Sequence, residues 1–80
     1  MIADEVLPIR VATFARRYKL NRREEEVLAL IVSGVAPKAV GSKLGCAHAT
    51  VRTHLVRIFS KLDCSGACEV LIKFFSEESF

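Results

Sequence analysis

The 80-residue sequence lacks any long hydrophobic run, and it lacks a cleavable export signal. No stretch approaches the roughly 18 apolar residues that cross a bilayer, so we expect no membrane contact. Residues 1–7 carry two acids and no basic residue, which excludes a signal peptide. These absences together predict a cytoplasmic protein.

The residue patterns of an enzyme or a metal site are also missing. Cys46, Cys64 and Cys68 are an odd number without a disulfide framework, so we expect reduced thiols. Cys64 and Cys68 lie one helical turn apart and could join His48 or His54 on a metal, but no second ligand pair stands at zinc spacing. With no activated nucleophile and no glycine-rich phosphate loop, we expect no catalytic residue, metal or cofactor.

Acidic residues are absent from Val27 to Leu62, although the chain has nine of them elsewhere. The same stretch holds both histidines and five basic residues: Lys38, Lys43, Arg52, Arg57 and Lys61. The net charge of +3 is modest, so the distribution of charge is more informative than its sum. A domain that segregates charge in this way usually faces a polyanion, and nucleic acid is the first candidate.

Hydrophobic spacing and end signals predict an all-α chain of five helices. They are expected at Pro8 to Lys19, Asn21 to Gly34, Pro37 to Leu44, His48 to Leu62 and Ala67 to Ser76. Pro8 and Pro37 suit first helical positions. Asn21 and Glu24 form a capping-box pair, and Gly34 ends the second helix in a left-handed conformation.

The third and fourth expected helices are joined by a three- to four-residue turn that begins with glycine, the geometry of a helix-turn-helix. Gly41 costs about 1 kcal/mol inside the third helix, which the close approach of another helix would explain. The buried stripe of the fourth helix is expected at Val51, Leu55, Ile58 and Leu62. Its opposite side is small and polar, is bordered by Arg52 and Arg57, and could enter a major groove about 12 Å wide. Ordinary exposed surface is the alternative.

The last expected helix has more apolar residues than one buried face requires. We therefore predict a homodimer contact through Val70, Leu71, Phe74 and Phe75. The N-terminal arm, residues 1–19, is expected to pack on the main domain as a short helix. A basic arm that touches phosphate is the alternative.

Two segments resemble the LuxR-type helix-turn-helix domain, also called GerE- or NarL-type. Residues 20–28 read LNRREEEVL, and the family usually reads Leu-Thr-x-Arg-Glu-x-Glu-Val-Leu. Residues 50–62 read TVRTHLVRIFSKL, similar to the family's Thr-Val-Lys-x-His-x-x-x-Ile-x-x-Lys-Leu. The likeness covers about Leu20 to Phe75 without a gap. It implies a four-helix DNA-binding domain of bacterial transcription regulators over residues 20–80, with an extra N-terminal helix.

The resemblance also implies roles for individual residues. Contacts with DNA bases are implied for Arg52, Thr53 and Val56, and contacts with the DNA backbone for Lys38, Thr50, Arg57 and Lys61. Val56 replaces a residue that is often polar, which favours apolar contact with a thymine methyl. His54 occupies the signature histidine position and flanks the expected core, so a structural role is expected.

Some positions depart from the family pattern. Ala36 and Ala47 stand where the family usually has a Ser or Thr helix cap, and each loss lowers helix stability by about 1 kcal/mol. In addition, Ala67 replaces an arginine and Asp63 replaces a glycine. These changes favour an alternative, a protein-interaction module of the same fold that binds a partner regulator or RNA polymerase. Only nineteen residues precede the match, which implies either a stand-alone GerE-like regulator, associated with the nucleoid, or a piece of a longer chain.

Overall fold

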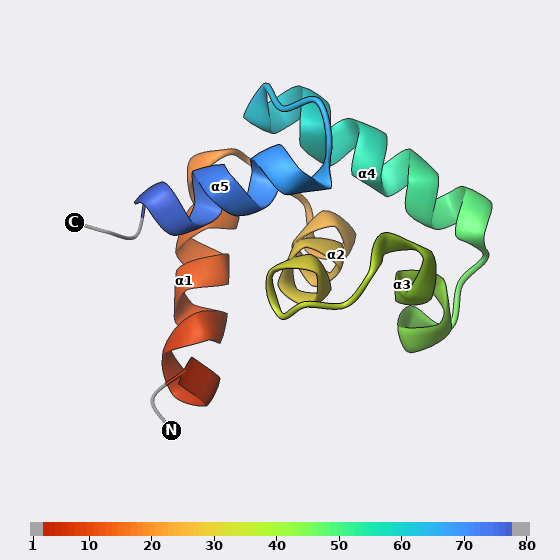
Figure 1. The fold of residues 1–80 in the computed structure, drawn as a ribbon, viewed down its shortest axis with the longest axis horizontal. Coiled ribbons are helices and arrows are strands. Elements are labelled where there is room, and N and C mark those ends of the chain that lie inside the picture. The colour runs from red at the N-terminus through yellow and green to blue at the C-terminus, as the bar shows by residue number, and fades with distance from the viewer. Residues whose placement is uncertain (1–2, 78–80) are drawn as a thin grey trace.

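Five helices make up the part of the chain that the structure describes, the backbone of residues 3–77 and the side chains of residues 7–77. In this computed structural model they are α1 (Ala3–Arg17), α2 (Arg22–Val32), α3 (Pro37–Leu44), α4 (His48–Leu62) and α5 (Ala67–Glu77). Residues 3–77 contain no strand, and the expected all-α class is confirmed. None of these helices has the length and apolar character needed to cross a membrane. α2 lies in the middle, with α3 and α4 on one side and α1 and α5 on the other (Figure 1).

Both ends of α2 follow the local signals in the sequence. The Asn21 side-chain oxygen accepts a hydrogen bond from the Glu24 N–H at 2.8 Å, and the Glu24 carboxylate accepts one from the Asn21 N–H at 3.0 Å. This capping box satisfies two N–H groups that a helix start leaves without partners. At the other end, Gly34 has a φ of +99°, which residues with a Cβ rarely adopt. The predicted cap and the predicted glycine stop are both confirmed.

α3 and α4 form a compact helix-turn-helix. Residues 45–47 join the two helices, and Gly45 is left-handed with a φ of +70°. A Cβ on Gly41 would lie 2.7 Å from the Cys46 carbonyl oxygen and 3.6 Å from Val51 Cγ2. The close approach that explains this glycine therefore comes first from the turn, rather than from another helix as the sequence suggests. The tight turn fixes the angle between α3 and α4.

The hydrophobic core lies mainly between α2 and α4. The stripe predicted on α4 is buried at all four positions: Val51, Leu55, Ile58 and Leu62. Facing it, α2 contributes Val27, Leu28, Ile31 and Val32. Because one side of α4 is buried so completely, its opposite side must face solvent.

α1 begins before Pro8, so the predicted start is wrong, whereas its end at Arg17 lies close to the expected one at about Lys19. The helix runs over Ala3–Arg17 with Pro8 inside it. A proline there removes only one backbone hydrogen bond close to the helix start. Val11 and Phe14 are buried in the shared core, and this packing holds the helix across the proline. Lys19 is left-handed with a φ of +60°, which ends the helical conformation.

Candidate nucleic-acid interface

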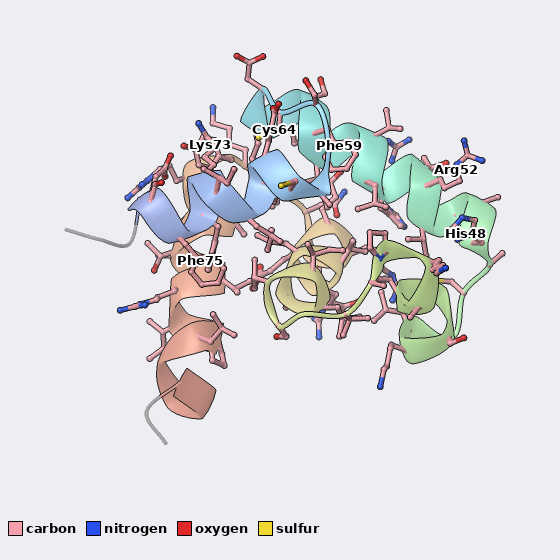
Figure 2. The ribbon with its side chains drawn as sticks, viewed as in Figure 1. His48, Arg52, Phe59, Cys64, Lys73 and Phe75 are labelled. Atoms are coloured by element: carbon pink, nitrogen blue, oxygen red, sulfur yellow. The ribbon has the colours of Figure 1, made fainter. Side chains whose placement is uncertain are left out.

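The solvent side of α4 is open to a partner. We call this side the outer face of α4, and its residues Ala49, Arg52, Thr53, Val56, Arg57 and Ser60 are all exposed. The Arg52 side chain extends from α4 away from the other helices (Figure 2). No acidic residue belongs to α4. A helix about 10–12 Å across with such a face fits a major groove about 12 Å wide.

A shallow hollow of about 420 Å³ lies on the outer face, lined by Ala49, Arg52, Thr53, Val56 and Arg57. The structure thus brings together the three residues implied as base contacts, Arg52, Thr53 and Val56. The Thr53 hydroxyl donates to the Ala49 carbonyl oxygen at 3.2 Å, so its proton is used by the helix backbone. Val56 is 64% exposed. The floor of the hollow is therefore small and apolar, and the two guanidinium groups supply its donors.

The two arginines of the outer face, and Lys38 on α3, have no carboxylate within ion-pair distance among the described residues. Several cations elsewhere are paired, as where Arg17 lies 2.7 Å from Glu77. Within residues 7–77, no ion pair involves Lys38, Arg52 or Arg57. Unpaired cations on one side of a domain attract phosphate groups.

The N-termini of α3 and α4 lack side-chain caps. Ala36 and Ala47 stand at the N-cap positions, and neither makes a side-chain hydrogen bond. Helix N-termini of this kind favour an anion, because free N–H groups and the helix dipole point at it. Thr50 is exposed in the first turn of α4, beside these free groups.

Lys61 is held by the protein itself. Its Nζ donates to Glu24 Oε1 at 2.7 Å and to the Lys19 carbonyl oxygen at 3.1 Å. The implied contact of Lys61 with the DNA backbone stays a prediction, and this arrangement disfavours it because two protein oxygens already bind the ammonium group. The sequence offered no signal for the pair, since the two side chains are 37 residues apart and Glu24 already has a role as a cap.

Glu24 is the only charged side chain that the structure buries among residues 7–77. Burial raises the pKa of Glu24, but hydrogen bonds from Lys61 and the Asn21 N–H, with the nearby charges of Lys61 and Arg57, outweigh it and lower the pKa overall. The second carboxylate oxygen, Oε2, is buried without a hydrogen-bond partner in the described part of the chain. The charged form of Glu24 therefore depends on Lys61.

The cysteines and histidines do not gather around a metal. The side chains of residues 7–77 include no group of three or more ligating residues that could hold one, and Cys46, Cys64 and Cys68 are free thiols. Burial raises the pKa of Cys64, which disfavours its reactive thiolate form. His54 is half-buried against the core, and no described residue hydrogen-bonds its buried Nδ1 atom.

α5 divides the four residues predicted for a dimer contact into two groups. Val70 and Phe74 are only 2% and 1% exposed, because they pack into the core of their own chain. Their assignment to a dimer interface is therefore wrong. Phe75 is 48% exposed and Leu71 is half-buried, and both remain accessible. A helical wheel alone could not distinguish the face that closes the core from the face beside it.

The C-terminal half of α1 and the C-terminal end of α5 are in contact. The Phe14 and Phe74 rings meet edge to face at 5.1 Å. The Glu77 carboxylate accepts hydrogen bonds from Arg17, at 2.7 Å, and from the Tyr18 hydroxyl. Burial raises the pKa of Glu77, but these hydrogen bonds and the neighbouring cations lower it overall. α1 therefore contacts the C-terminal end of α5 and shares the domain core.

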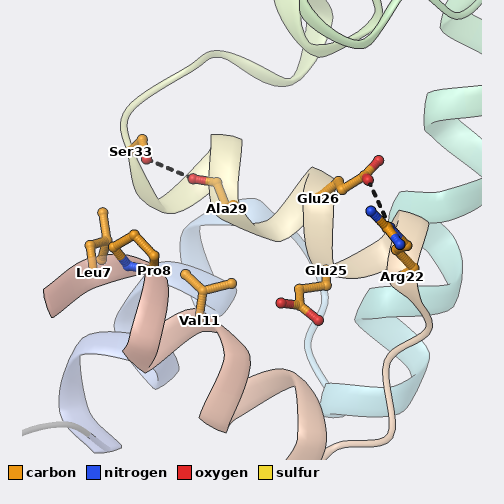
Figure 3. A pocket seen from close by; sticks show the side chains of 8 residues that line it. All are labelled: Leu7, Pro8, Val11, Arg22, Glu25, Glu26, Ala29 and Ser33. Carbon is orange, nitrogen blue, oxygen red and sulfur yellow. Dashed lines mark hydrogen bonds and ion pairs between the residues drawn. The ribbon is translucent and has the colours of Figure 1, made fainter. Parts of the chain in front are cut away.

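A second hollow, of about 620 Å³, lies at the surface between α1 and α2. It is lined by Leu7, Pro8, Val11, Arg22, Glu25, Glu26, Ala29 and Ser33. Leu7, Pro8 and Val11 face the residues of α2 across it (Figure 3). The Ser33 hydroxyl donates to the Ala29 carbonyl oxygen at 2.7 Å, so its proton is not directed into the hollow. An apolar wall with a charged rim suits a protein contact better than a reaction.

Sequence comparisons identify bacterial transcription regulators that are similar to this chain. The family described as bacterial regulatory proteins, luxR family, matches residues 18–74. The transcriptional regulatory protein LiaR of Bacillus subtilis (strain 168) is 40% identical over 53 residues, which cover 66% of this chain and 25% of LiaR. The HTH-type transcriptional regulator MalT of Vibrio campbellii (strain ATCC BAA-1116) is 31% identical over 62 residues, which cover 78% of this chain and 7% of MalT. No solved structure matches the chain.

The matched residues 18–74 contain all of α2, α3 and α4 and most of α5. They include the whole outer face of α4, whereas α1 precedes them. The chain spans a quarter or less of each of these relatives. With its helix-turn-helix of α3 and α4, the chain belongs to the luxR family of bacterial regulatory proteins, as a DNA-binding domain of that family.

Proposed function

We propose that this protein regulates transcription by placing α4 in the major groove of DNA and reading bases with Arg52, Thr53 and Val56. The outer face of α4 supports this most directly, because it is exposed, free of acid and bounded by two guanidinium groups that form no ion pair within residues 7–77. Arginine can donate two hydrogen bonds to the O6 and N7 atoms of one guanine. Thr53 offers its hydroxyl oxygen as an acceptor, and Val56 offers an apolar contact.

Lys38, Thr50 and Arg57 complete the proposed interface by contacting phosphates. The uncapped starts of α3 and α4 would accept phosphate oxygens beside these side chains. Lys61 has no place in this set, because Glu24 holds it. Each cation that meets a phosphate releases counterions, so affinity should fall steeply with salt.

Arg52→Ala should lower the affinity for a selected duplex by about 1–3 kcal/mol and relax the preference at one base position, because the paired guanine contact is lost. Lys38→Ala should weaken the binding of all duplexes alike and reduce the salt slope by about one. Fluorescence anisotropy titrations on the selected duplex and on a scrambled duplex, each at several salt concentrations, measure both effects.

Arg22→Ala is the matched control, since it removes one positive charge from a side chain that is 95% exposed on α2. It should change neither the base preference nor the folding. If the Arg52→Ala protein binds the selected duplex as tightly as the parent does, the assignment of the reading face is wrong.

We further propose that two copies bind DNA together through α5. Ile72 is 62% exposed and Phe75 is 48% exposed, and Leu71 lies beside them. Large apolar side chains on one helix favour self-association. A two-fold dimer would present two α4 helices to half-sites about 34–36 Å apart, one turn of DNA.

A protein-interaction module of the same fold is the second candidate. It is favoured by the hollow between α1 and α2 and by the missing hydroxyls at Ala36 and Ala47, which weaken the proposed grip on phosphate. Its partner would be another regulator or RNA polymerase. A gel-shift titration on random-sequence duplex DNA at low salt separates the two candidates, because only a DNA-binding domain shifts the duplex at micromolar protein.

The names of LiaR and MalT describe regulators of transcription, and the chain spans only part of each. What we carry over from them is therefore limited to regulation through DNA. A protein with this role would act at the nucleoid, in the cytoplasm.

A further inference from the structure

We infer that the hollow on the outer face of α4 binds the 5-methyl group of a pyrimidine, so that the protein prefers thymine, or 5-methylcytosine, to unmethylated cytosine and uracil at one position of each half-site. This inference rests on the proposed DNA binding. It assigns to Val56 and to the hollow around it a chemical specificity that a helix in the major groove does not by itself imply.

Val56 is unusual in its exposure. Among residues 7–77, the large apolar side chains that remain exposed are Ile9, Val56, Ile72 and Phe75. Ile72 and Phe75 belong to α5 and Ile9 to α1, so Val56 alone lies on α4. Because Val56 is 64% exposed, its side chain contributes little buried apolar area to the fold, and a bound partner would bury its methyl groups.

The hydrogen-bond donors around Val56 are limited to two arginines. Ala49 contributes a methyl group to the same hollow. The Thr53 hydroxyl donates to the Ala49 carbonyl oxygen and so has no proton left for a base. Only Arg52 and Arg57, at the margins, can donate. An apolar floor with donors at its edges matches the pyrimidine methyl, the one apolar group that base edges present in the major groove.

Helix geometry links this contact to that of Arg52. Arg52 and Val56 are four residues apart, so their side chains lie on the same side of α4, about 6 Å apart along its axis. Successive base pairs are about 3.4 Å apart. The methyl group that Val56 contacts should therefore lie within about two base pairs of the guanine that Arg52 contacts.

The experiment uses the full chain and a duplex selected from a random library. Each thymine of the selected duplex is replaced, one at a time, by deoxyuridine, which removes only the methyl group. We expect one position in each half-site to lose affinity about fourfold, the factor that about 0.8 kcal/mol for one buried methyl implies. A duplex with cytosine at that position should bind the protein more weakly than the thymine duplex, and a duplex with 5-methylcytosine there should recover part of the lost affinity.

Val56→Ala should bind the thymine and deoxyuridine duplexes with equal affinity, because the side chain that meets the methyl is gone. Ile9→Ala, a truncation of an equally exposed side chain on α1, should keep the fourfold difference. Circular dichroism checks that both variants are folded. A parent protein that ignores every deoxyuridine replacement overturns the inference, as does a Val56→Ala protein that keeps the difference. If no duplex is selected at all, the proposed DNA binding itself fails.

Discussion

Replacing Lys61 with methionine should destabilise the fold by about 1–3 kcal/mol at neutral pH, because it leaves the buried Glu24 carboxylate without its cation, while water that reaches the partly exposed Lys61 site offsets some of the loss. The carboxylate is 1% exposed, and its Oε1 atom receives the Lys61 ammonium at 2.7 Å. Its Oε2 atom lacks a described partner, so the Asn21 N–H and the more distant charge of Arg57 are what remain to stabilise the carboxylate. A domain of this size has a total stability of only about 5–15 kcal/mol, and urea denaturation would measure the loss directly.

The effect should shrink as the pH falls. In the parent protein the pKa of Glu24 is lowered, so its contribution to stability is present above the ordinary value of 4.5 and is lost as the pH falls through the folded pKa. Without Lys61, burial should raise the pKa of Glu24, and the variant should gain stability as this group becomes protonated. Both trends reduce the difference in the free energy of unfolding between the parent and the Lys61→Met protein as the pH falls.

Lys43→Met is the matched control, because Lys43 is exposed and forms no ion pair with any of the described residues. It should change the free energy of unfolding by less than about 0.5 kcal/mol. Adding Glu24→Gln to Lys61→Met should recover part of the stability, since the buried charge is then gone. A Lys61→Met protein as stable as the Lys43→Met protein would contradict the role of the pair.

Phe74→Ala should cost about 3–5 kcal/mol, because it opens a cavity where α1, α2 and α5 meet. The ring is 1% exposed and meets the Phe14 ring at 5.1 Å. Since Phe74 belongs to the core of its own chain, this loss should not depend on protein concentration. Denaturation at two protein concentrations measures this loss of stability. If the alanine variant does not fold, Phe74→Leu, which should lose less stability, takes its place.

Ile72→Ala is the contrasting variant on the same helix. Ile72 is 62% exposed, so its truncation should scarcely change the unfolding of a single chain. It should instead weaken self-association, which sedimentation equilibrium would detect. If Phe74→Ala dissociates a dimer and leaves a stable monomer, the placement of Phe74 in the core is wrong.

Signals within one helix or one turn were sufficient to predict most of the fold. The Asn21 cap, the Gly34 stop and the bounds of α3 and α4 depend on residues within a few positions of each other, and the structure confirms them. The buried stripe of α4 followed from the same periodicity. Because that stripe was predictable, the opposite, outer face was predictable as well.

The errors involve contacts between helices distant in sequence. For Lys61 the resemblance implies a phosphate contact, and nothing in its sequence neighbourhood indicates the Glu24 carboxylate on α2 that holds it. Phe74 looked like part of a dimer surface because the packing of α1 over α5 was not apparent from periodicity. Pro8 looked like a helix start because proline prefers that position, while core packing of α1 overrode the preference. In each case tertiary packing decided the outcome.

In vitro selection of bound duplexes from a random DNA library tests the central claim most directly, that the outer face of α4 reads DNA. We predict enrichment of one short motif, repeated in inverted orientation with centres about one DNA turn apart. Within each repeat, a thymine should lie within about two base pairs of a guanine. A pool that shows no enrichment over the input library after repeated rounds, with folded protein, would contradict the account.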